Sequence, residues 1–239
     1  MGEKSEHCER IVCQQCAAER ALDFDFTMAF QPIIDCQAQR VFGYEALVRG
    51  LHNEPAPVVI AHVTEENRYL FDQQCRIKAI SLASKLGIDG ILSINFLPNA
   101  VTYQFPTQNI MFEFTEGEQI ADSRHIKRII EYYQSLGFRT AIDDFGAGYS
   151  GLNLLADFQT NIVKLDMALI RSIDSDFARQ AIVRHCLAMF AELNITPLAE
   201  GIETLAEYQW LKEAGISLMQ GYLFAKPGFE CLPAVNFIR

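Results

Sequence analysis

The chain has 239 residues, of which 50% are hydrophobic and 21% are charged, a balance typical of a globular domain with a packed core. Its formal net charge of −10, without a basic stripe, excludes a protein that binds DNA or RNA as a polymer. No apolar run approaches the roughly 18 residues of a membrane span, and the charged N-terminus MGEKSEHCER lacks the apolar core of a secretory signal, so we expect no membrane association and a cytoplasmic location.

Residues 1–22 are polar and show no periodic pattern, which predicts a tail or a short cap. No linker rich in Pro, Gly or Ser interrupts the rest, so residues 23–239 are expected to form one domain. The chain has seven cysteines, an odd number spread over its length, which disfavours a disulfide framework. Four residues near the N-terminus could offer ligands for zinc: His7, Cys8, Cys13 and Cys16. Their spacing is not that of a standard zinc knuckle, so we favour a tail whose thiols bind no metal.

Short apolar runs rich in β-branched and aromatic residues then alternate with longer helical patterns. The predicted strands, in chain order, are Met28–Ile34, Val41–Val48, Ile91–Asn95, Ile110–Phe114, Arg139–Asp143, Ile162–Leu165, Pro197–Ala199 and a weak Leu218–Gly221. The predicted helices are Phe71–Leu86, Ser123–Leu136, Phe177–Leu193 and Thr204–Ala214. A glycine follows three of these helices, as expected of a C-cap: Gly87, Gly137 and Gly215.

Strands that alternate with helices predict an α/β fold in which a parallel sheet is surrounded by crossover helices. The number of strands fits a closed (β/α)₈ barrel better than an open doubly wound sheet. Only DCQAQR separates Ile34 from Val41, which is too short for a helical crossover. We therefore expect an antiparallel hairpin and an irregular start to the barrel.

Polar side chains interrupt or end these strands in the region where a barrel enzyme keeps its active site, the rim at the carboxyl ends of the strands. Taken singly, each has a structural explanation, since Asp and Asn often cap helices or close turns and a Lys or Glu can face solvent. Several carboxylates converging on one rim repel one another unless cations neutralise them, so the combination predicts a metal site. The residues are Asn95, Glu113, Glu116, Asp143, Asp144, Lys164, Glu200 and Gln220, to which the hairpin adds Gln31 and Glu45.

Carboxylate and amide oxygens favour hard ions such as Mg²⁺ or Mn²⁺. The adjacent acids Asp143 and Asp144 allow one carboxylate to bridge two ions while its neighbour binds one. Two such ions about 3.5–4 Å apart suit an in-line displacement at phosphorus, with a lysine to orient the attacking water. The histidines lie outside the strand ends.

At these positions the sequence resembles the EAL-domain cyclic-di-GMP phosphodiesterases. The resemblance begins with Glu45-Ala46-Leu47 and extends in order and spacing over roughly residues 26–230. The matching segments are Phe30–Ile33, Ser93–Asn95, Glu113–Glu116, Asp143–Leu152, Val163–Asp166, Ala199–Thr204 and Gln220–Phe224.

The resemblance implies a barrel with an antiparallel first strand, acting as a homodimer. Its implied reaction is metal-dependent hydrolysis of one phosphodiester of cyclic-di-GMP to the linear dinucleotide pGpG. It also implies two divalent cations. Their ligands would be Glu45, Asn95, Glu113 and Asp143 for the first, and Asp143, Asp144 and Glu200 for the second.

The remaining roles are implied in the same way. Lys164 would contact the attacking water, and Glu200 is a further candidate for the general base. Gln31 and Gln220 would complete the polar shell around substrate and water. Glu116 would anchor the loop after Asp144, which is expected to couple dimer contacts to the metal site. Arg49 would contact a phosphate or a guanine edge of the substrate.

Two positions depart from the family pattern. Lys226-Pro227 stands where Arg-Pro is common, so a substrate contact there keeps its charge but loses the bidentate geometry of arginine. Gly151 stands where a Ser is frequent, which is expected to loosen the loop slightly.

Two other functions fit parts of the pattern. A receptor or interaction module would hold cyclic-di-GMP or a protein partner without cleaving it, but such a module has no need to keep Lys164 and every metal acid. A Schiff-base lyase would use a lysine on a barrel strand as its nucleophile. That chemistry does not require a set of converging carboxylates.

Overall fold

The computed structural model describes residues 22–95, 107–115, 123–147 and 151–238. The described residues include only the last residue of the predicted tail, and they include neither the four candidate zinc ligands nor Glu116. The assignments made for these residues therefore stay predictions. In the described part of the chain, no helix combines the length and the apolar character needed to cross a bilayer.

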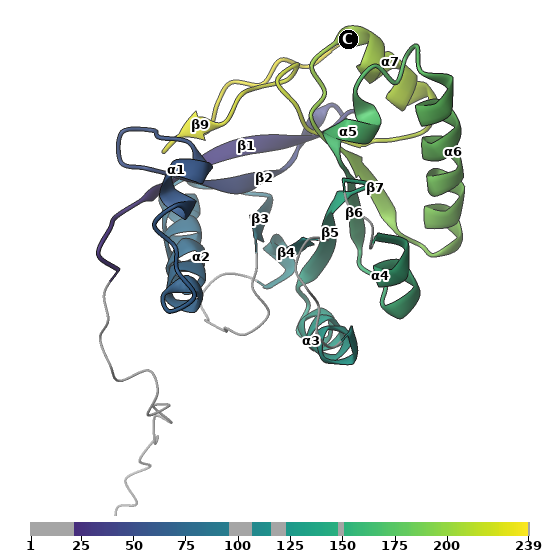
Figure 1. The fold of residues 1–239 in the computed structure, drawn as a ribbon. Helices are drawn as coiled ribbons and strands as arrows, with labels where there is room; N and C mark the ends of the chain where they lie inside the picture. Colours follow the sequence, from purple (N-terminus) through teal and green to yellow (C-terminus); the bar gives the residue numbers. More distant parts are fainter. Residues whose placement is uncertain (1–21, 96–106, 116–122, 148–150, 239) are drawn as a thin grey trace, which may run out of the picture.

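The described strands form one sheet that closes on itself (Figure 1). Strands β2 to β8 follow one another in chain order, and β1 closes the ring by pairing with both β8 and β2. The predicted (β/α)₈ barrel is therefore confirmed. The strands are β1 (Thr27–Asp35), β2 (Arg40–Arg49), β3 (Ile91–Asn95), β4 (Ile110–Thr115), β5 (Arg139–Phe145), β6 (Ile162–Leu165), β7 (Thr196–Ala199), β8 (Leu218–Met219) and β9 (Gly228–Phe229).

The irregular start of the barrel is also confirmed. β1 runs antiparallel to β2 and β8, whereas each neighbouring pair from β2 to β8 is parallel. In the tight turn between β1 and β2, the Asp35 carboxylate accepts hydrogen bonds from the backbone N–H groups of Gln37 and Ala38. The hairpin register sets Gln31 opposite Glu45.

The helices lie outside the strands (Figure 1). All four predicted helices are present within a few residues of their expected bounds, and Gly87, at the end of α2, has the left-handed φ of 69° expected of its C-cap. The short α1, α4, α5 and β9 were not predicted, because such brief segments show no periodic pattern. The helices are α1 (Ala56–Ile60), α2 (Arg68–Leu86), α3 (Ser123–Ser135), α4 (Gly151–Asp157), α5 (Met167–Ile170), α6 (Phe177–Glu192) and α7 (Leu205–Glu213), with a 3₁₀ turn η1 (Thr107–Asn109).

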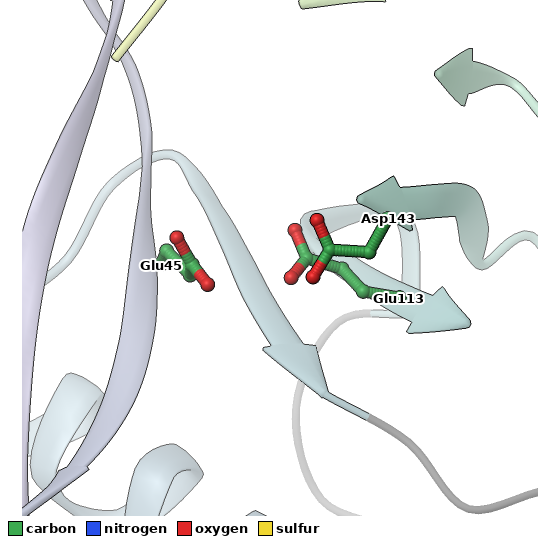
Figure 2. A group of neighbouring side chains, drawn as sticks. All are labelled: Glu45, Glu113 and Asp143. Carbon is green, nitrogen blue, oxygen red and sulfur yellow. The ribbon is translucent and has the colours of Figure 1, made fainter. Parts of the chain in front are cut away.

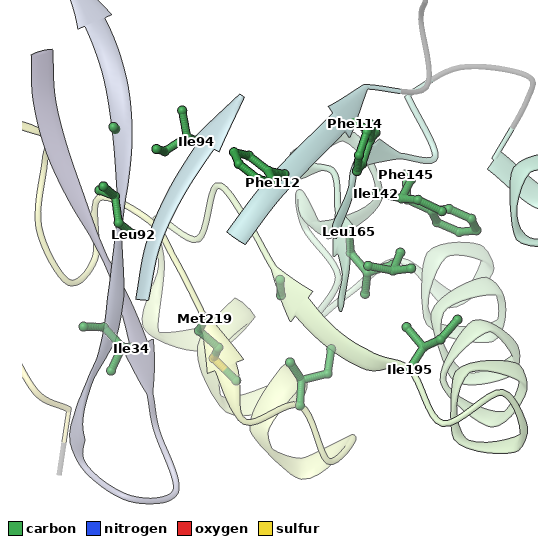
Figure 3. Close-up of a cluster of buried hydrophobic side chains, with 14 of the residues drawn as sticks. Ile34, Leu92, Ile94, Phe112, Phe114, Ile142, Phe145, Leu165, Ile195 and Met219 are labelled. Atoms are coloured by element: carbon green, nitrogen blue, oxygen red, sulfur yellow. The ribbon is translucent and has the colours of Figure 1, made fainter. Parts of the chain in front are cut away.

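The hydrophobic core has two parts, because successive side chains of a strand point to opposite faces of the sheet. The larger part packs the strands against the helices, with Leu92, Phe112 and Ile142 among its members (Figure 3). The smaller part fills the barrel interior with one side chain from nearly every strand. Its members are Ile33, Ile91, Met111, Ala141, Ile162, Leu198 and Leu218. This apolar layer forms the floor of the candidate site.

Candidate active site

A polar layer lies directly above the apolar floor. In a strand the residue two positions along shares the same face, so each interior apolar residue is followed by a polar one. In β4 the polar residue two positions after Met111 is Glu113, and in β6 the one two positions after Ile162 is Lys164. Because β1 is antiparallel, its polar residue, Gln31, comes two positions before Ile33. The layer comprises Gln31, Glu45, Ser93, Glu113, Asp143, Lys164, Glu200 and Gln220.

Lys164 lies at the centre of this layer and is almost completely buried, with 1% of its side chain exposed. Burial acts to lower the pKa of its ammonium group, but the surrounding carboxylates outweigh burial and raise that pKa well above its usual range. The amine is therefore a protonated cation and a poor nucleophile, which argues against a Schiff-base lyase. Its Nζ lies 2.8 Å from Glu200 Oε1, 2.9 Å from Asp143 Oδ1, 3.0 Å from Glu113 Oε1 and 3.6 Å from Glu45 Oε1.

The carboxylates form two groups, each with ligand oxygens within 4.8 Å of one another. Glu45, Glu113 and Asp143 make the first group (Figure 2), and Asp143, Asp144 and Glu200 make the second. Asp143 belongs to both. These groups coincide with the two ligand sets that the family resemblance implied, apart from the amide of Asn95. Asn95 ends β3, is exposed and stands opposite Glu113 in the strand register.

A bulge in β5 brings two successive acids to the same site. Regular strand geometry would point Asp143 and Asp144 to opposite faces. Instead, the pairing of β5 with β6 shifts register between Ile142 and Phe145, and Asp144 adopts a left-handed φ of 55°. Asp is among the few non-glycine residues that tolerate this conformation. The backbone N–H of Asp144 also donates to Asp143 Oδ1 at 3.0 Å, which helps to orient that carboxylate.

The donor set fits a pair of hard divalent cations. Burial raises the pKa of Glu113 to about 8 and that of Asp144 to about 6, and in both cases neighbouring acids add to the shift. Burial likewise raises the pKa of Glu200 well above its usual range. Glu113 Oε2 is buried and has no hydrogen-bond partner among the described residues. Such a set of crowded, desolvated oxygens is what a bound cation would satisfy.

Gln220 links the acids to the hairpin. Its Nε2 donates to Glu45 Oε2 at 2.6 Å and to Gln31 Oε1 at 3.2 Å. Gln31 Nε2 in turn donates to the carbonyl of Ala225 at 3.3 Å. The two glutamines thus hold one edge of the acidic layer, and the shell around substrate and water that the resemblance implied for them stays a prediction.

A pocket of about 410 Å³ opens above the acids, within the range of roughly 300–1,000 Å³ usual for small-molecule sites. Among its lining residues, sequence reasoning did not single out Asp166, Met167, Glu203 and Tyr222. Asp166 lies two residues past Lys164 in the VKLD segment and could have been found from that spacing. The predicted substrate residues Arg49, Lys226 and Pro227 are not among the described lining residues, although Lys226 Nζ lies 5.3 Å from the centroid of the Tyr222 ring.

Residues 15–227 match the EAL domain family. The chain belongs to the EAL domain family. The match starts inside the predicted tail, so the domain boundary at residue 23 stays a prediction. Among curated relatives, the blue light- and temperature-regulated antirepressor BluF of Escherichia coli (strain K12) is 31% identical over 236 residues, which cover 92% of this chain and 58% of BluF. The probable cyclic di-GMP phosphodiesterase PdeN of the same strain is 29% identical, covering 90% of this chain and 45% of PdeN. The chain thus spans about half the length of these curated relatives.

Two solved structures share the EAL fold. A standalone versatile EAL protein from Vibrio cholerae O395, in its c-di-GMP bound form, is 65% identical, with a TM-score of 0.87. The alignment covers 90% of this chain and 98% of that protein. Klebsiella pneumoniae BlrP1, in a manganese/cy-diGMP complex, is 33% identical, with a TM-score of 0.80 over 89% of this chain and 58% of BlrP1.

In this EAL barrel, a buried carboxylate holds the loop that follows Glu200. Glu207, in the first turn of α7, is 2% exposed. Its Oε2 accepts hydrogen bonds from the backbone N–H groups of Glu203 and Thr204, each at 3.1 Å, and its Oε1 accepts one from Ser172 at 3.1 Å. Arg171 contacts Glu207 and also donates to the carbonyl of Gly201 at 3.4 Å. The network joins the loop after β7 to α5.

We expect Glu207→Ala to lower the free energy of unfolding by about 3 kcal/mol, because it leaves several backbone donors without their charged acceptor. Urea denaturation measures this cost. Glu213→Ala is the matched control, since Glu213 lies exposed at the end of the same helix and its removal should change stability little. Equal midpoints for the two variants would contradict the role given to Glu207.

Proposed function

We propose that this chain hydrolyses one phosphodiester bond of cyclic-di-GMP to give linear pGpG, using two divalent cations, Mg²⁺ or Mn²⁺. The observation that carries the proposal is the pair of carboxylate groups that share Asp143 around the buried Lys164. Family membership and the substrate named for PdeN, together with the ligand of the V. cholerae structure, support cyclic-di-GMP as the substrate. The manganese in the BlrP1 complex supports the cations.

The cations would be held by the two carboxylate groups, with the amide of Asn95 as a further ligand of the first. When bound, they supply Lewis-acid stabilisation of the charge that develops on the phosphate oxygens. The protein's own side chains compensate charge and orient the attacking water. Lys164 offsets the charge of the acids and is proposed to orient the attacking water, while Gln31 and Gln220 hold the edge of the layer.

Glu200 is proposed to accept the proton of the attacking water, because its carboxylate lies in the second group and 2.8 Å from the Nζ of Lys164, the residue proposed to orient that water. The water oxygen forms a bond to phosphorus as the bond from phosphorus to the ribose 3′ oxygen breaks. The 3′ oxygen takes up a proton and leaves as a hydroxyl, so that pGpG carries a 5′ phosphate. Arg49, Lys226 and Pro227 are proposed to contact the substrate outside the pocket lining described above.

The other properties expected from the sequence carry over as proposals. They are a tail or cap over residues 1–22 ahead of a barrel over 23–239, anchoring of the loop after Asp144 by Glu116, a homodimer, and a cytoplasmic location. Sedimentation of the full chain at several concentrations tests the dimer.

The test is turnover of cyclic-di-GMP by the full chain with Mg²⁺ or Mn²⁺, with and without EDTA. We expect pGpG to form with metal and to disappear with EDTA. Glu45→Ala, which removes a member of the first carboxylate group and the acceptor of the Gln220 hydrogen bond, is expected to abolish product even with metal present. Product formation that survives both EDTA and Glu45→Ala would contradict the proposal.

A receptor or interaction module is the second candidate, because the relative BluF is named as an antirepressor. The same experiment separates the two functions. Tight binding of intact cyclic-di-GMP without pGpG, in the presence of either metal, would favour the receptor.

A further inference from the structure

Ser93 occupies an unusual position for a hydroxyl group. It lies in the middle of β3 with 0% of its surface exposed, on the same interior face as Ile91. A hydroxyl buried in an apolar barrel costs stability unless it is hydrogen-bonded. Its partner therefore indicates what the residue does.

That partner is Glu113, on the neighbouring strand β4. Ser93 Oγ donates to Glu113 Oε1 at 2.5 Å, and the same oxygen lies 3.0 Å from Lys164 Nζ. Both contacts therefore fall on one carboxylate oxygen. The other, Oε2, is buried and has no hydrogen-bond partner among the described residues. Glu113 also belongs to the carboxylate group with Glu45 and Asp143.

We propose that Ser93 is a positioning residue that fixes the rotation of the Glu113 carboxylate and leaves Oε2 as the oxygen presented to a divalent cation. The inference rests on the metal site of the proposed function. Lys164 alone, a point charge that contacts four carboxylates, does not fix the plane of any one of them. The directional hydroxyl of Ser93 supplies that restraint.

The test is direct binding of Mn²⁺ to the metal-free full chain, measured by calorimetry without substrate. Ser93→Ala is expected to weaken binding about 10- to 100-fold, the usual effect of removing the hydrogen-bond partner of a metal ligand. Ser93→Cys is nearly isosteric but donates only weakly, so it should bind Mn²⁺ about as poorly as Ser93→Ala. Ser93→Thr keeps the hydroxyl and should restore most of the affinity. Ser81→Ala, at an exposed position of α2, is the control.

Turnover gives a second measurement. We expect Ser93→Ala to require more Mn²⁺ for half-maximal rate while kcat at saturating Mn²⁺ stays close to the wild-type value. If Ser93→Cys binds Mn²⁺ as the wild type does, the residue acts through packing alone and the inference is wrong. It is also wrong if the wild type binds no Mn²⁺. If the wild type binds Mn²⁺ but releases no pGpG, the proposed function fails while the comparison of Ser93 variants still stands.

Discussion

Lys164→Met is expected to abolish turnover and, in EDTA, to lower the free energy of unfolding by about 3–5 kcal/mol, the cost of breaking a buried ion pair by removing one partner. The lysine is buried, and its Nζ lies within 3.6 Å of four carboxylates. Methionine has a similar length but no charge, so it leaves those acids to repel one another in a desolvated layer.

Cations should relieve this repulsion. We therefore expect Mn²⁺ to stabilise Lys164→Met by more than it stabilises the wild type, although turnover stays lost because the side chain proposed to orient the attacking water is missing. Urea denaturation with EDTA and with Mn²⁺ measures both effects. Lys85→Met, at an exposed position in the last turn of α2, is the control. A Lys164→Met variant as stable as the wild type in EDTA would contradict the account of this layer.

Asp143→Asn is expected to reduce kcat about 10⁴-fold. When catalytic residues act together, the loss of one member can cost nearly as much rate as the loss of the whole set. Asp143 belongs to both carboxylate groups, contacts Lys164 at 2.9 Å and accepts the N–H of Asp144. Its neighbour Asp144 belongs to one group, so Asp144→Asn should cost only about 10²- to 10³-fold, comparable to the loss of a single stabilising group.

The two variants make the same chemical change at adjacent positions, so their comparison tests whether Asp143, the member common to both groups, matters more than Asp144. Rates of pGpG formation at saturating Mn²⁺ measure the difference, and Mn²⁺ titration gives the number of ions bound. We expect Asp144→Asn to retain the ion of the first group and Asp143→Asn to bind neither tightly. Asp157→Asn, exposed at the end of α4, is the control. Equal losses for Asp143→Asn and Asp144→Asn would contradict a shared ligand.

Much of the barrel could be predicted because its periodic patterns are strong. Polar side chains interrupt or end the apolar strand segments, and this pattern allowed Glu113 and Lys164 to be assigned from the sequence to the rim at the carboxyl ends of the strands. The short connection from Ile34 to Val41 predicted the hairpin, and the structure adds the register that sets Gln31 opposite Glu45. Each of these inferences depends only on the spacing of residues within one segment of the chain, which can be counted directly in the sequence.

The features that could not be predicted depend on contacts between segments. The bulge at Asp144 is set by the pairing of β5 with β6, and nothing in TAIDDF alone requires a positive φ there. Ser93 looks like an ordinary strand residue until Glu113 on the next strand is placed beside it. The two-residue β9 forms only because its chain returns to the edge of β1. Arg49 and Lys226 were assigned to substrate binding from the family resemblance. Their distance from the substrate depends on where the substrate lies, and the sequence does not give that position.

Hydrolysis by this barrel is tested by incubating the metal-free chain with cyclic-di-GMP in H₂¹⁸O, adding Mn²⁺ and analysing the products by mass spectrometry. Metal-dependent attack of water on phosphorus should give pGpG that carries one ¹⁸O in its 5′ phosphate, and no product before Mn²⁺ is added. Recovery of intact cyclic-di-GMP from a tight complex, with Mn²⁺ bound and no pGpG, would contradict hydrolysis and identify the barrel as a receptor.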